Sequence, residues 1–436
     1  MDKPLDVPQP GSPPPASTDN QLRLLLPVGV GFLALTCVVL AGVWISLQRS
    51  PAPPRAPKEV KLLVWTTESG SRLEQLFAWA EAFHAEHPEI TLQVTSYEQG
   101  QLRENFQSST LVAGWPDLLW TVNDHTAPFA RTNLIRPVDN LGFDLGAFLP
   151  GALEAVRLDG KTWGIPMSVN NHLMLLYNKD LVRTPPKDTD ELIRLAQQLT
   201  VGDGYGLAYN LDEPFWLVPW LGSYDGAVFS ADGKMLTLNS PAMKNALQLL
   251  YDFKFKYQIV PQECDYGCAD ALFKEGRAAM IINGDWSLGE YQQALGDKLG
   301  AAALPQVSGA GWPKPYLAGA YLMFPRYMTN DQLNAAREFA NYILSDQVQL
   351  GYVESGGQLP VVRRLLDDER IRQDPILSGS AEALRHAAGV PPQPEMDCNW
   401  KAIRPNLKAM MAGKLSPAEA SEAMQTMAEE CIGETQ

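Results

Sequence analysis

Aromatic side chains in this chain stand close to carboxylate and amide side chains at several positions. Trp120 lies in a predicted strand, 116–122, that ends just before Asn123 and Asp124, while Glu213 and Phe215 lie together in the segment DEPFW. A flat aromatic ring covers the C–H face of a sugar-like ring, and planar polar groups pair with its hydroxyls. Because a buried polar group left unpaired costs about 1–3 kcal/mol, such a site rejects compounds that lack the matching hydroxyl. These residue types therefore suit the binding of a neutral, hydroxyl-rich compound.

Other chemistry has little support in the sequence. The 5 Cys and 5 His form no C-x-x-C pair and no H-E-x-x-H helix, so we predict no metal site. The GKT of DGKTWG has Ala155 where a phosphate-binding loop needs its first glycine, and we interpret it as a turn. Glu213 and Asp124 could act as a glycosidase pair only at a carboxyl separation of about 5–9.5 Å. We expect no enzyme activity, no catalytic residue and no cofactor.

Length and charge set further limits. The chain has 436 residues, 45% of them hydrophobic, which is enough for two or three domains with a large core. Its 35 Lys and Arg against 50 Asp and Glu give a net charge of -15. This charge argues against a nucleic-acid partner, because binding to phosphates requires a basic face.

The first 58 residues divide into three segments. Residues 1–21 are polar and proline-rich, and we expect them to be disordered. Residues 24–47 carry no charge and at about 1.5 Å per residue could cross a ~30 Å hydrocarbon core. We therefore predict a transmembrane signal-anchor over 22–47, with a cleaved signal peptide as the alternative. Residues 48–58 read as an extended proline-rich linker.

Four cysteines lie outside this apolar run, namely Cys264, Cys268, Cys398 and Cys431. An even number suits two disulfides in an oxidising compartment, and four buried free thiols are the alternative. A 398–431 bridge would contribute about 3–4 kcal/mol and a 264–268 bridge about 2 kcal/mol. Basic residues beyond the apolar run would place the domain in the cytoplasm, but large domains translocate largely regardless of flanking charge. We expect a membrane-anchored protein that faces the periplasm or the cell exterior.

From residue 60 onward, strand and helix patterns alternate. The first unit has the order β-α-β-α-β, which predicts a parallel sheet covered by helices, with strands 60–65, 90–97 and 116–122 and helices 71–87 and 102–114. Strands 159–169 and 172–181 come next, joined by a short polar break at Asn170-Asn171. A second unit follows, with strands 205–210, 278–284 and 316–325 and helices 189–200 and 240–257. We expect Thr189 to cap the first of these helices, and Ser240 with Pro241 to open the second. The remainder is mostly helical. The fold class is α/β.

Several segments, in order, resemble extracellular solute-binding proteins of the maltose/maltodextrin-binding type, the receptor component of ABC sugar importers. They are FHAEHPEITLQV, GWPDLLWTVND, DGKTWGIPMSVNNHLMLLYNKDL, INGDWS and NWKAIRPNL. The resemblance implies a two-lobed periplasmic-binding-protein fold of type II. Lobe I would comprise residues 59–168 and 318–375, and lobe II residues 169–317 and 376–436. The first crossing between the lobes would fall at Asn170-Asn171.

The resemblance also implies roles for individual residues in lobe II. Glu213 and Phe215 match the family's E-P-aromatic element, although Phe stands here where the family has Tyr. Trp286 and Trp400 match stacking tryptophans, and Arg404 lies one helical turn after Trp400. Lys401 stands where the enterobacterial receptor has a Tyr. Core packing remains the alternative for Trp286, and a helix first-turn acid is the alternative for Glu213.

In lobe I and at the hinge the match is looser. Trp120 with Asn123 or Asp124 corresponds to a Trp and Asp that contact the sugar, with one extra residue here. Glu68 stands near an Asp-Lys pair of the family, and this chain lacks the Lys. Asn170 or Asn171 replaces a ligand-contacting Glu. The alternatives are core packing for Trp120, a helix N-cap for Asp124 and a strand cap for the Asn.

The resemblance implies a receptor that binds a neutral oligosaccharide, maltose or maltodextrin above all, in the cleft between the lobes. It would deliver this ligand to the membrane permease subunits of an ABC transporter, and we expect a monomer. The alternatives are a receptor of the same fold for trehalose, a glucosyl-polyol, a glycerol phosphodiester or a peptide. A membrane-anchored ligand sensor is an alternative from a different class.

Overall fold

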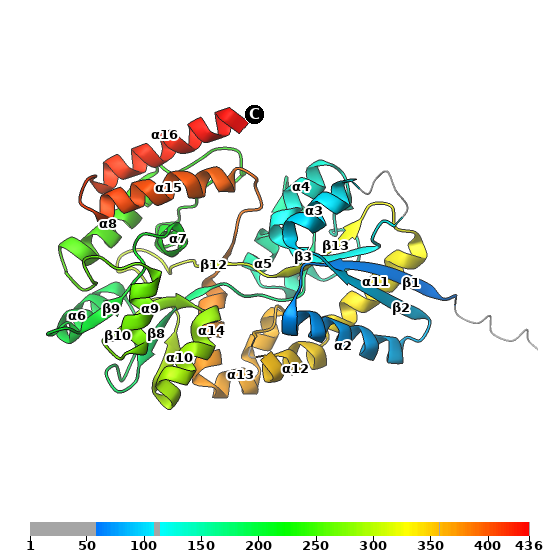
Figure 1. Ribbon diagram of the computed structural model, residues 1–436, viewed down its shortest axis with the longest axis horizontal. Helices are drawn as coiled ribbons and strands as arrows, with labels where there is room; N and C mark the ends of the chain where they lie inside the picture. Colours follow the sequence, from blue (N-terminus) through cyan, green and yellow to red (C-terminus); the bar gives the residue numbers. More distant parts are fainter. Residues whose placement is uncertain (1–57, 109–113, 357, 436) are drawn as a thin grey trace, which may run out of the picture. The chain divides into compact units, whose positions relative to one another are not determined.

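The structure of this chain is a computed structural model that describes residues 58–108, 114–356 and 358–435. Residues 59–436 form one compact unit, which Figure 1 shows in colour. The predicted disordered segment 1–21, the predicted anchor 22–47 and the linker up to residue 57 lie outside the described residues. Within the described ranges, no helix combines the length and the apolar character that crossing a membrane requires.

The unit is built on two separate sheets. The larger has the strand order β2-β1-β3-β13-β4, and β7 also pairs with β13. As the β-α-β-α-β pattern predicts, β1 runs parallel to β2 and to β3, whereas β13 returns antiparallel beside β3. The strand bounds are β1 Val60–Thr66, β2 Ile90–Ser96, β3 Leu118–Val122, β4 Ile135–Arg136, β7 Ile165–Pro166 and β13 Ala320–Pro325.

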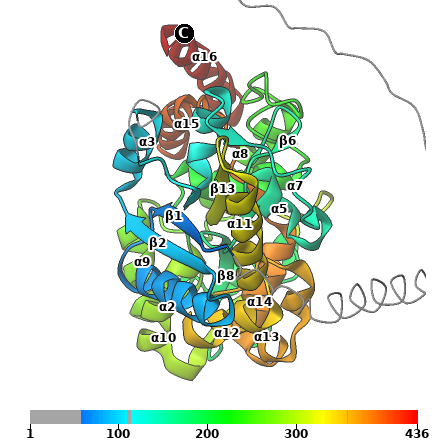
Figure 2. The same ribbon diagram turned by 90° about the vertical axis from the view of Figure 1, so that its right-hand side faces the viewer.

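Alternate residues of these strands pack into two different cores, because successive side chains of a strand point to opposite faces. Leu62 and Val64 pack with α2 (Gly70–Glu86) and α11 (Asn330–Ile343). On the other face, Trp65 and Leu119 pack with α3 (Gln99–Ser108) and α4 (Thr126–Arg131). Helices thus cover both faces of this sheet, which forms the first lobe (Figure 2).

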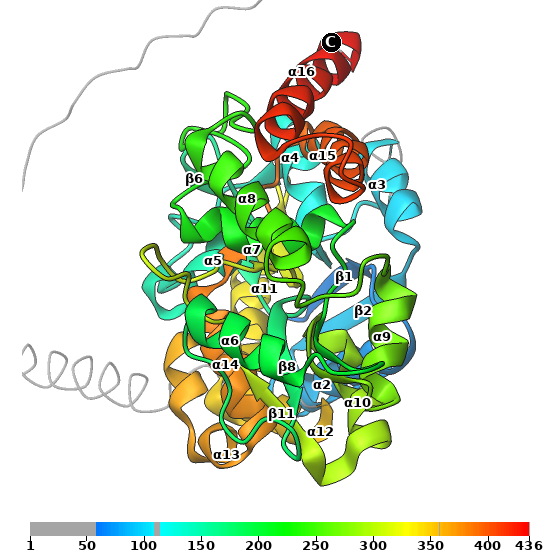
Figure 3. The same ribbon diagram turned by 90° about the vertical axis from the view of Figure 1, so that its left-hand side faces the viewer.

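The smaller sheet has the order β11-β8-β10-β9 and forms the second lobe (Figure 3). Strand β8 is antiparallel to β10 and β11, and β9 is parallel to β10. Side chains of β8 and β10 alternate between a core shared with α6, α7, α8, α15 and α16 and a core shared with α9 and α10. The bounds are β8 Leu173–Asn178, β9 Tyr205–Ala208, β10 Ala278–Gly284, β11 Leu299–Ala302, α6 Thr189–Leu199, α7 Pro214–Ser223, α8 Pro241–Phe255, α9 Tyr266–Lys274, α10 Leu288–Leu295, α15 Met396–Met411 and α16 Pro417–Thr435.

Short elements complete the two lobes. Strands β12 and β14 pair in parallel, and β5 and β6 form a small hairpin. The remaining bounds are β5 Arg157–Leu158, β6 Lys161–Thr162, β12 Tyr316–Leu317, β14 Ala388–Gly389, α5 Pro150–Glu154, α12 Asp346–Gly356, α13 Glu369–Gln373, α14 Pro375–His386, η2 Asn123–His125, η3 Leu145–Ala147, η4 Asp285–Ser287, η5 Gly296–Lys298 and η6 Arg363–Asp367.

Helix starts follow the local chemistry of the sequence. As predicted, Ser240 caps α8 by accepting a hydrogen bond from the Met243 N–H, with Pro241 in the first turn. The predicted cap of α6 is wrong by one residue. The cap is Asp188, whose carboxylate accepts from the Glu191 N–H at 2.9 Å, while Thr189 is the first helical residue.

Two predicted strands are broken in the structure. The expected strand 159–169 is reduced to β6 and β7, which pair with different partners: β6 with β5, and β7 with β13. The expected strand 316–325 is divided into β12 and β13 by Ala318-Gly319. A Cβ atom on Gly319 would lie 2.0 Å from the carbonyl oxygen of Ser168, so only glycine permits this approach.

This close approach joins two chain segments that run between the lobes. Asn170 and Ala318 exchange both backbone hydrogen bonds, at 2.8 and 2.9 Å. Asn171 has a positive φ of 61° and its N–H donates to the Asp285 carboxylate at 2.9 Å. Asn tolerates this left-handed backbone better than most residues, so the turn at the predicted first crossing suits the Asn-Asn pair.

Both predicted disulfides are formed. Cys264 bonds to Cys268 at the start of α9, and Cys398 in α15 bonds to Cys431 in α16. The alternative of four free thiols is therefore wrong.

Candidate functional site

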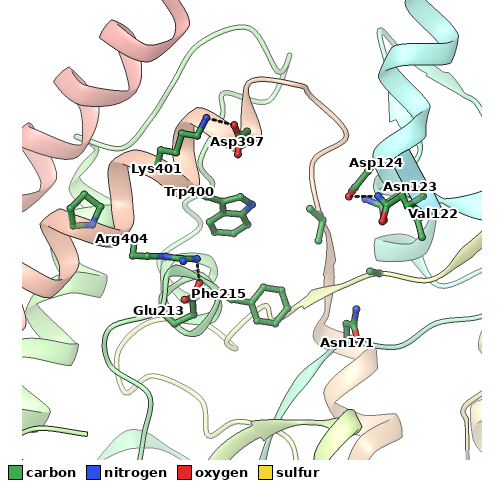
Figure 4. A pocket seen from close by; sticks show the side chains of 14 residues that line it. Val122, Asn123, Asp124, Asn171, Glu213, Phe215, Asp397, Trp400, Lys401 and Arg404 are labelled. Atoms are coloured by element: carbon green, nitrogen blue, oxygen red, sulfur yellow. Dashed lines mark hydrogen bonds and ion pairs between the residues drawn. The ribbon is translucent and has the colours of Figure 1, made fainter. Parts of the chain in front are cut away.

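A cavity of about 690 Å³ lies between the two lobes (Figure 4). Its walls come from α3 and the end of β3 in the first lobe, from α7 and α15 in the second, and from the crossing segments. The lining residues are Gln99, Val122, Asn123, Asp124, Asn171, Glu213, Phe215, Ala318, Val390, Asp397, Trp400, Lys401, Arg404 and Pro405. Six predicted site residues are among them: Asn123, Asp124, Glu213, Phe215, Trp400 and Arg404.

The first-lobe wall is the turn that follows β3. Strand β3 ends at Val122, and Asn123 and Asp124 begin the short helix η2 at the carboxyl end of the strand, where α/β sheets commonly bind ligands. The Asp124 carboxylate caps no helix and accepts only a long hydrogen bond from Gln99, at 3.4 Å. It remains accessible to water in the cavity, yet partial desolvation by the surrounding protein raises its pKa. Asp124 is thus available to a ligand.

The second-lobe wall combines two aromatic rings with two charged side chains. Glu213 and Phe215 lie at the N-terminus of α7 and Trp400 lies in α15, so that both rings are on one side of the cavity with Asn123 and Asp124 opposite (Figure 4). Glu213 is the N-cap residue of α7, but its side chain makes no capping hydrogen bond. Its carboxylate instead accepts from the Arg404 guanidinium at 2.8 Å. Glu213 thus lies at the helix N-terminus, as the first-turn-acid alternative requires, and its carboxylate also faces the cavity with Arg404 as partner.

Ion pairs nearly cancel the charge of this lining. Glu213 pairs with Arg404 at 2.8 Å, and Asp397 pairs with Lys401 at 2.6 Å. Within the described parts of the chain, Asp124 is the remaining charged lining residue and has no ion pair. The cavity lining therefore carries a net charge of about -1, which favours a neutral ligand over an anion.

Two further predicted residues border a neighbouring cavity of about 420 Å³. Trp286, 42% exposed, and the buried Asn170 line it, and Asn171 lines both this cavity and the larger one. The centroids of the Trp286 and Phe215 rings are 6.2 Å apart, so the aromatic surface of the second lobe continues from one cavity to the other. The alternative of core packing for Trp286 does not fit a ring with this exposure.

Trp120 and Glu68 lie apart from the larger cavity. The Trp120 ring is 3% exposed and packs against Trp79 and Phe339 in the core of the first lobe. Its Nε1–H donates to the Glu68 carboxylate at 3.3 Å. Neither residue is part of the cavity lining, and the core alternative for Trp120 is the one that its burial supports.

Sequence reasoning missed several lining residues. Asn171 rather than Asn170 reaches the larger cavity, a one-residue ambiguity that the pattern left open. Lys401 stands out in the sequence only as a departure from a family Tyr, and Asp397 does not stand out at all. Their i, i+4 spacing indicates an ion pair but does not point to a cavity. Gln99 and Val390 come from segments with no signal in the sequence.

The model of one protein family, described as bacterial extracellular solute-binding protein, matches residues 78–379. These residues include the whole of the smaller sheet and every strand of the larger sheet except β1. Of the second-lobe wall of the cavity they include α7 but not α15.

Individual relatives agree with this match. A maltotriose-binding protein of Pyrococcus abyssi is 27% identical over 353 residues, covering 79% of this chain and 76% of the relative. The solved maltose/maltodextrin-binding domain of Bdellovibrio bacteriovorus bound to maltotriose is 36% identical, with 86% of this chain and 100% of that chain covered and a TM-score of 0.64. An extracellular solute-binding protein of Staphylococcus aureus in complex with maltose shares the fold, at 22% identity, 87% and 99% coverage and a TM-score of 0.78.

Proposed function

The chain belongs to the bacterial extracellular solute-binding protein family, and we propose that it binds a neutral malto-oligosaccharide in the cavity between its two lobes. The observation that carries this proposal is the pairing of Phe215 and Trp400 around a cavity whose opposite wall presents Asn123 and Asp124. The rings would cover the faces of glucose units. The carboxylates and amides would pair with hydroxyls, at an affinity of about micromolar, or roughly -8 kcal/mol.

The charge of the lining supports a sugar over the other ligands that the sequence left open. A glycerol phosphodiester would need unpaired cations, but Arg404 and Lys401 are already paired with carboxylates. The relatives are named for maltotriose, galactooligosaccharide and maltodextrin rather than for trehalose or a glucosyl-polyol. Membership of a solute-binding family agrees with the expectation that the chain is not an enzyme.

We further propose that the lobes close over the sugar and that the closed form is recognised by the permease of an ABC importer. The ranges 59–168 with 318–375 and 169–317 with 376–436 would move as the two lobes. The Asn170–Ala318 backbone pair and α14 would serve as hinge segments, since α14 residues pack in the cores of both lobes.

We also propose that the protein is anchored in a membrane and faces the periplasm or the cell exterior. The apolar run over 22–47 would anchor it in a membrane, and residues 48–58 would hold the binding unit away from the surface. The two disulfides support an oxidising compartment, such as the periplasm or the cell exterior.

Calorimetric titration of the full-length chain tests the sugar assignment. The detergent must lack a sugar head group, since a maltoside would compete. The ligands are maltose, maltotriose, trehalose, glucosylglycerol and glycerophosphocholine. We expect micromolar binding of maltotriose that Trp400→Ala abolishes. The control is Trp312→Ala, which removes an exposed indole stacked on His386 outside the cavity lining. Tight binding of glycerophosphocholine with no response to the sugars would overturn the proposal.

A further inference from the structure

The Cys264–Cys268 disulfide closes a very short loop that contains an exposed aromatic residue. The two cysteines are four residues apart, and Tyr266 lies midway between them at the first position of α9. Asp265 caps the same turn, because its carboxylate accepts from the Cys268 N–H at 2.9 Å. The disulfide and the cap together fix the backbone on both sides of Tyr266, although its ring is 39% exposed.

Tyr266 reaches from this loop to Trp286, which lines the interlobe cavity of about 420 Å³. The Nε1–H of Trp286 donates to the Tyr266 hydroxyl at 3.2 Å. Both rings also contact Trp216 in T-shaped arrangements, with centroid distances of 5.9 Å for Tyr266 and 6.0 Å for Trp286. Trp216 is buried and its own Nε1–H donates to the Ile282 carbonyl at 2.8 Å, so it is a fixed support for the two exposed rings.

The Trp286 ring has one further constraint. It lies over the α-carbon of Gly284, where a Cβ atom would come within 2.0 Å of the ring. Gly284 and Trp216 restrict the ring by contact, but neither offers a partner for its indole N–H. Within the described residues, the directional contact of that N–H is the Tyr266 hydroxyl. An exposed indole held by one hydrogen bond in addition to these contacts has a single preferred orientation.

We propose that the Cys264–Cys268 disulfide is a positioning element of the ligand site, which holds Tyr266 so that its hydroxyl fixes the orientation of Trp286. The disulfide touches no ligand itself. It acts through Tyr266, and the preorganised indole face then costs less to order when a sugar ring stacks on it. This inference rests on the proposed function, because Trp286 continues the aromatic surface of Phe215 that we propose binds the sugar.

The test uses the full-length chain with two variants, Cys264→Ala/Cys268→Ala and Tyr266→Phe. Tyr266→Phe keeps the ring and removes the hydroxyl, and Tyr327→Phe is the matched control at an exposed tyrosine of the first lobe. Two readouts are taken. The first is maltotriose affinity by calorimetry. The second is the near-ultraviolet circular dichroism band of Trp286 without sugar, assigned by difference with Trp286→Phe.

We expect both variants to lose most of the Trp286 band and to bind maltotriose about three- to tenfold more weakly, with Tyr327→Phe unchanged. Wild-type affinity in both variants overturns the inference, and so does an unchanged Trp286 band. If the double cysteine variant fails to fold, Tyr266→Phe alone decides between these outcomes. If the wild-type chain binds no sugar, the proposed function fails, while the Trp286 band still decides whether the disulfide orients the indole.

Discussion

Removal of the Cys398–Cys431 disulfide should lower the stability of the protein and leave its ligand affinity unchanged. Cys398 lies in the first turn of α15 and Cys431 near the end of α16, 33 residues apart, so the bond closes a long loop. Loop-closure entropy gives a stabilisation of about 4 kcal/mol for a loop of this length. In a unit of this size, that loss corresponds to a melting temperature lower by about 5 °C.

The fold of the site should survive this change. Trp400 and Arg404 are carried by α15, which is held by buried Ala402, Ile403 and Leu407 independently of the disulfide. We therefore expect Cys398→Ala/Cys431→Ala to unfold at lower temperature in calorimetric scans, yet to bind maltotriose with unchanged affinity at 25 °C. An unchanged melting temperature would refute the entropy argument. A large loss of affinity would show that the bond, and not the core, positions α15.

Three other substitutions test separate parts of the account. Glu213→Gln should weaken maltotriose binding about 10- to 100-fold by calorimetry. It should change the unfolding free energy by less than ~1 kcal/mol, because the Glu213–Arg404 ion pair is partly exposed. Wild-type affinity in this variant would exclude Glu213 from the site. Gly319→Ala should lower the unfolding free energy, measured in urea, by more than about 2 kcal/mol, because its Cβ atom meets the Ser168 carbonyl. The control Gly351→Ala, at an open helical position, should not lower it. Equal effects of the two substitutions would contradict the close approach at Gly319. Burial, with a smaller contribution from the charge of Arg103, lowers the pKa of His125 to about 4, below the unfolded value of 6.5. Between these two pH values the unfolded chain binds more protons than the folded chain, so acid destabilises the fold. From pH 7 to pH 4.5, the unfolding free energy of the wild type should fall by about 2–3 kcal/mol more than that of His125→Gln. Parallel pH profiles of the two proteins would contradict this.

Much of the fold could be predicted because it depends on local patterns. The alternation of apolar strands and amphipathic helices indicated both α/β units, and the cysteine count indicated both disulfides. The break at Ala318-Gly319 could not be predicted, because it depends on the Ser168 carbonyl, which is distant in the sequence. An uninterrupted apolar run such as YLAGAYLMFP fits one strand as well as two.

Site residues could be predicted where a sequence motif identifies the residue. They could not be predicted where the side on which a side chain points decides whether it reaches the cavity. Glu213, Phe215, Trp400 and Arg404 line one cavity, as the family resemblance implied. Trp120 lies in a strand that is apolar on both faces, so its sequence gave no indication of the side on which the ring packs. At the hinge, a one-residue shift decides whether Asn170 or Asn171 faces the cavity, and a sequence pattern does not fix such a shift.

The most direct test of the central claim is a crystal structure of the chain grown with maltotriose. We expect sugar density in the interlobe cavity, with a glucose ring against Trp400 or Phe215 and hydroxyls within hydrogen-bond distance of Asp124 and Glu213. Maltotriose bound outside this cavity, or an empty cavity at a saturating concentration confirmed by calorimetry, would contradict it.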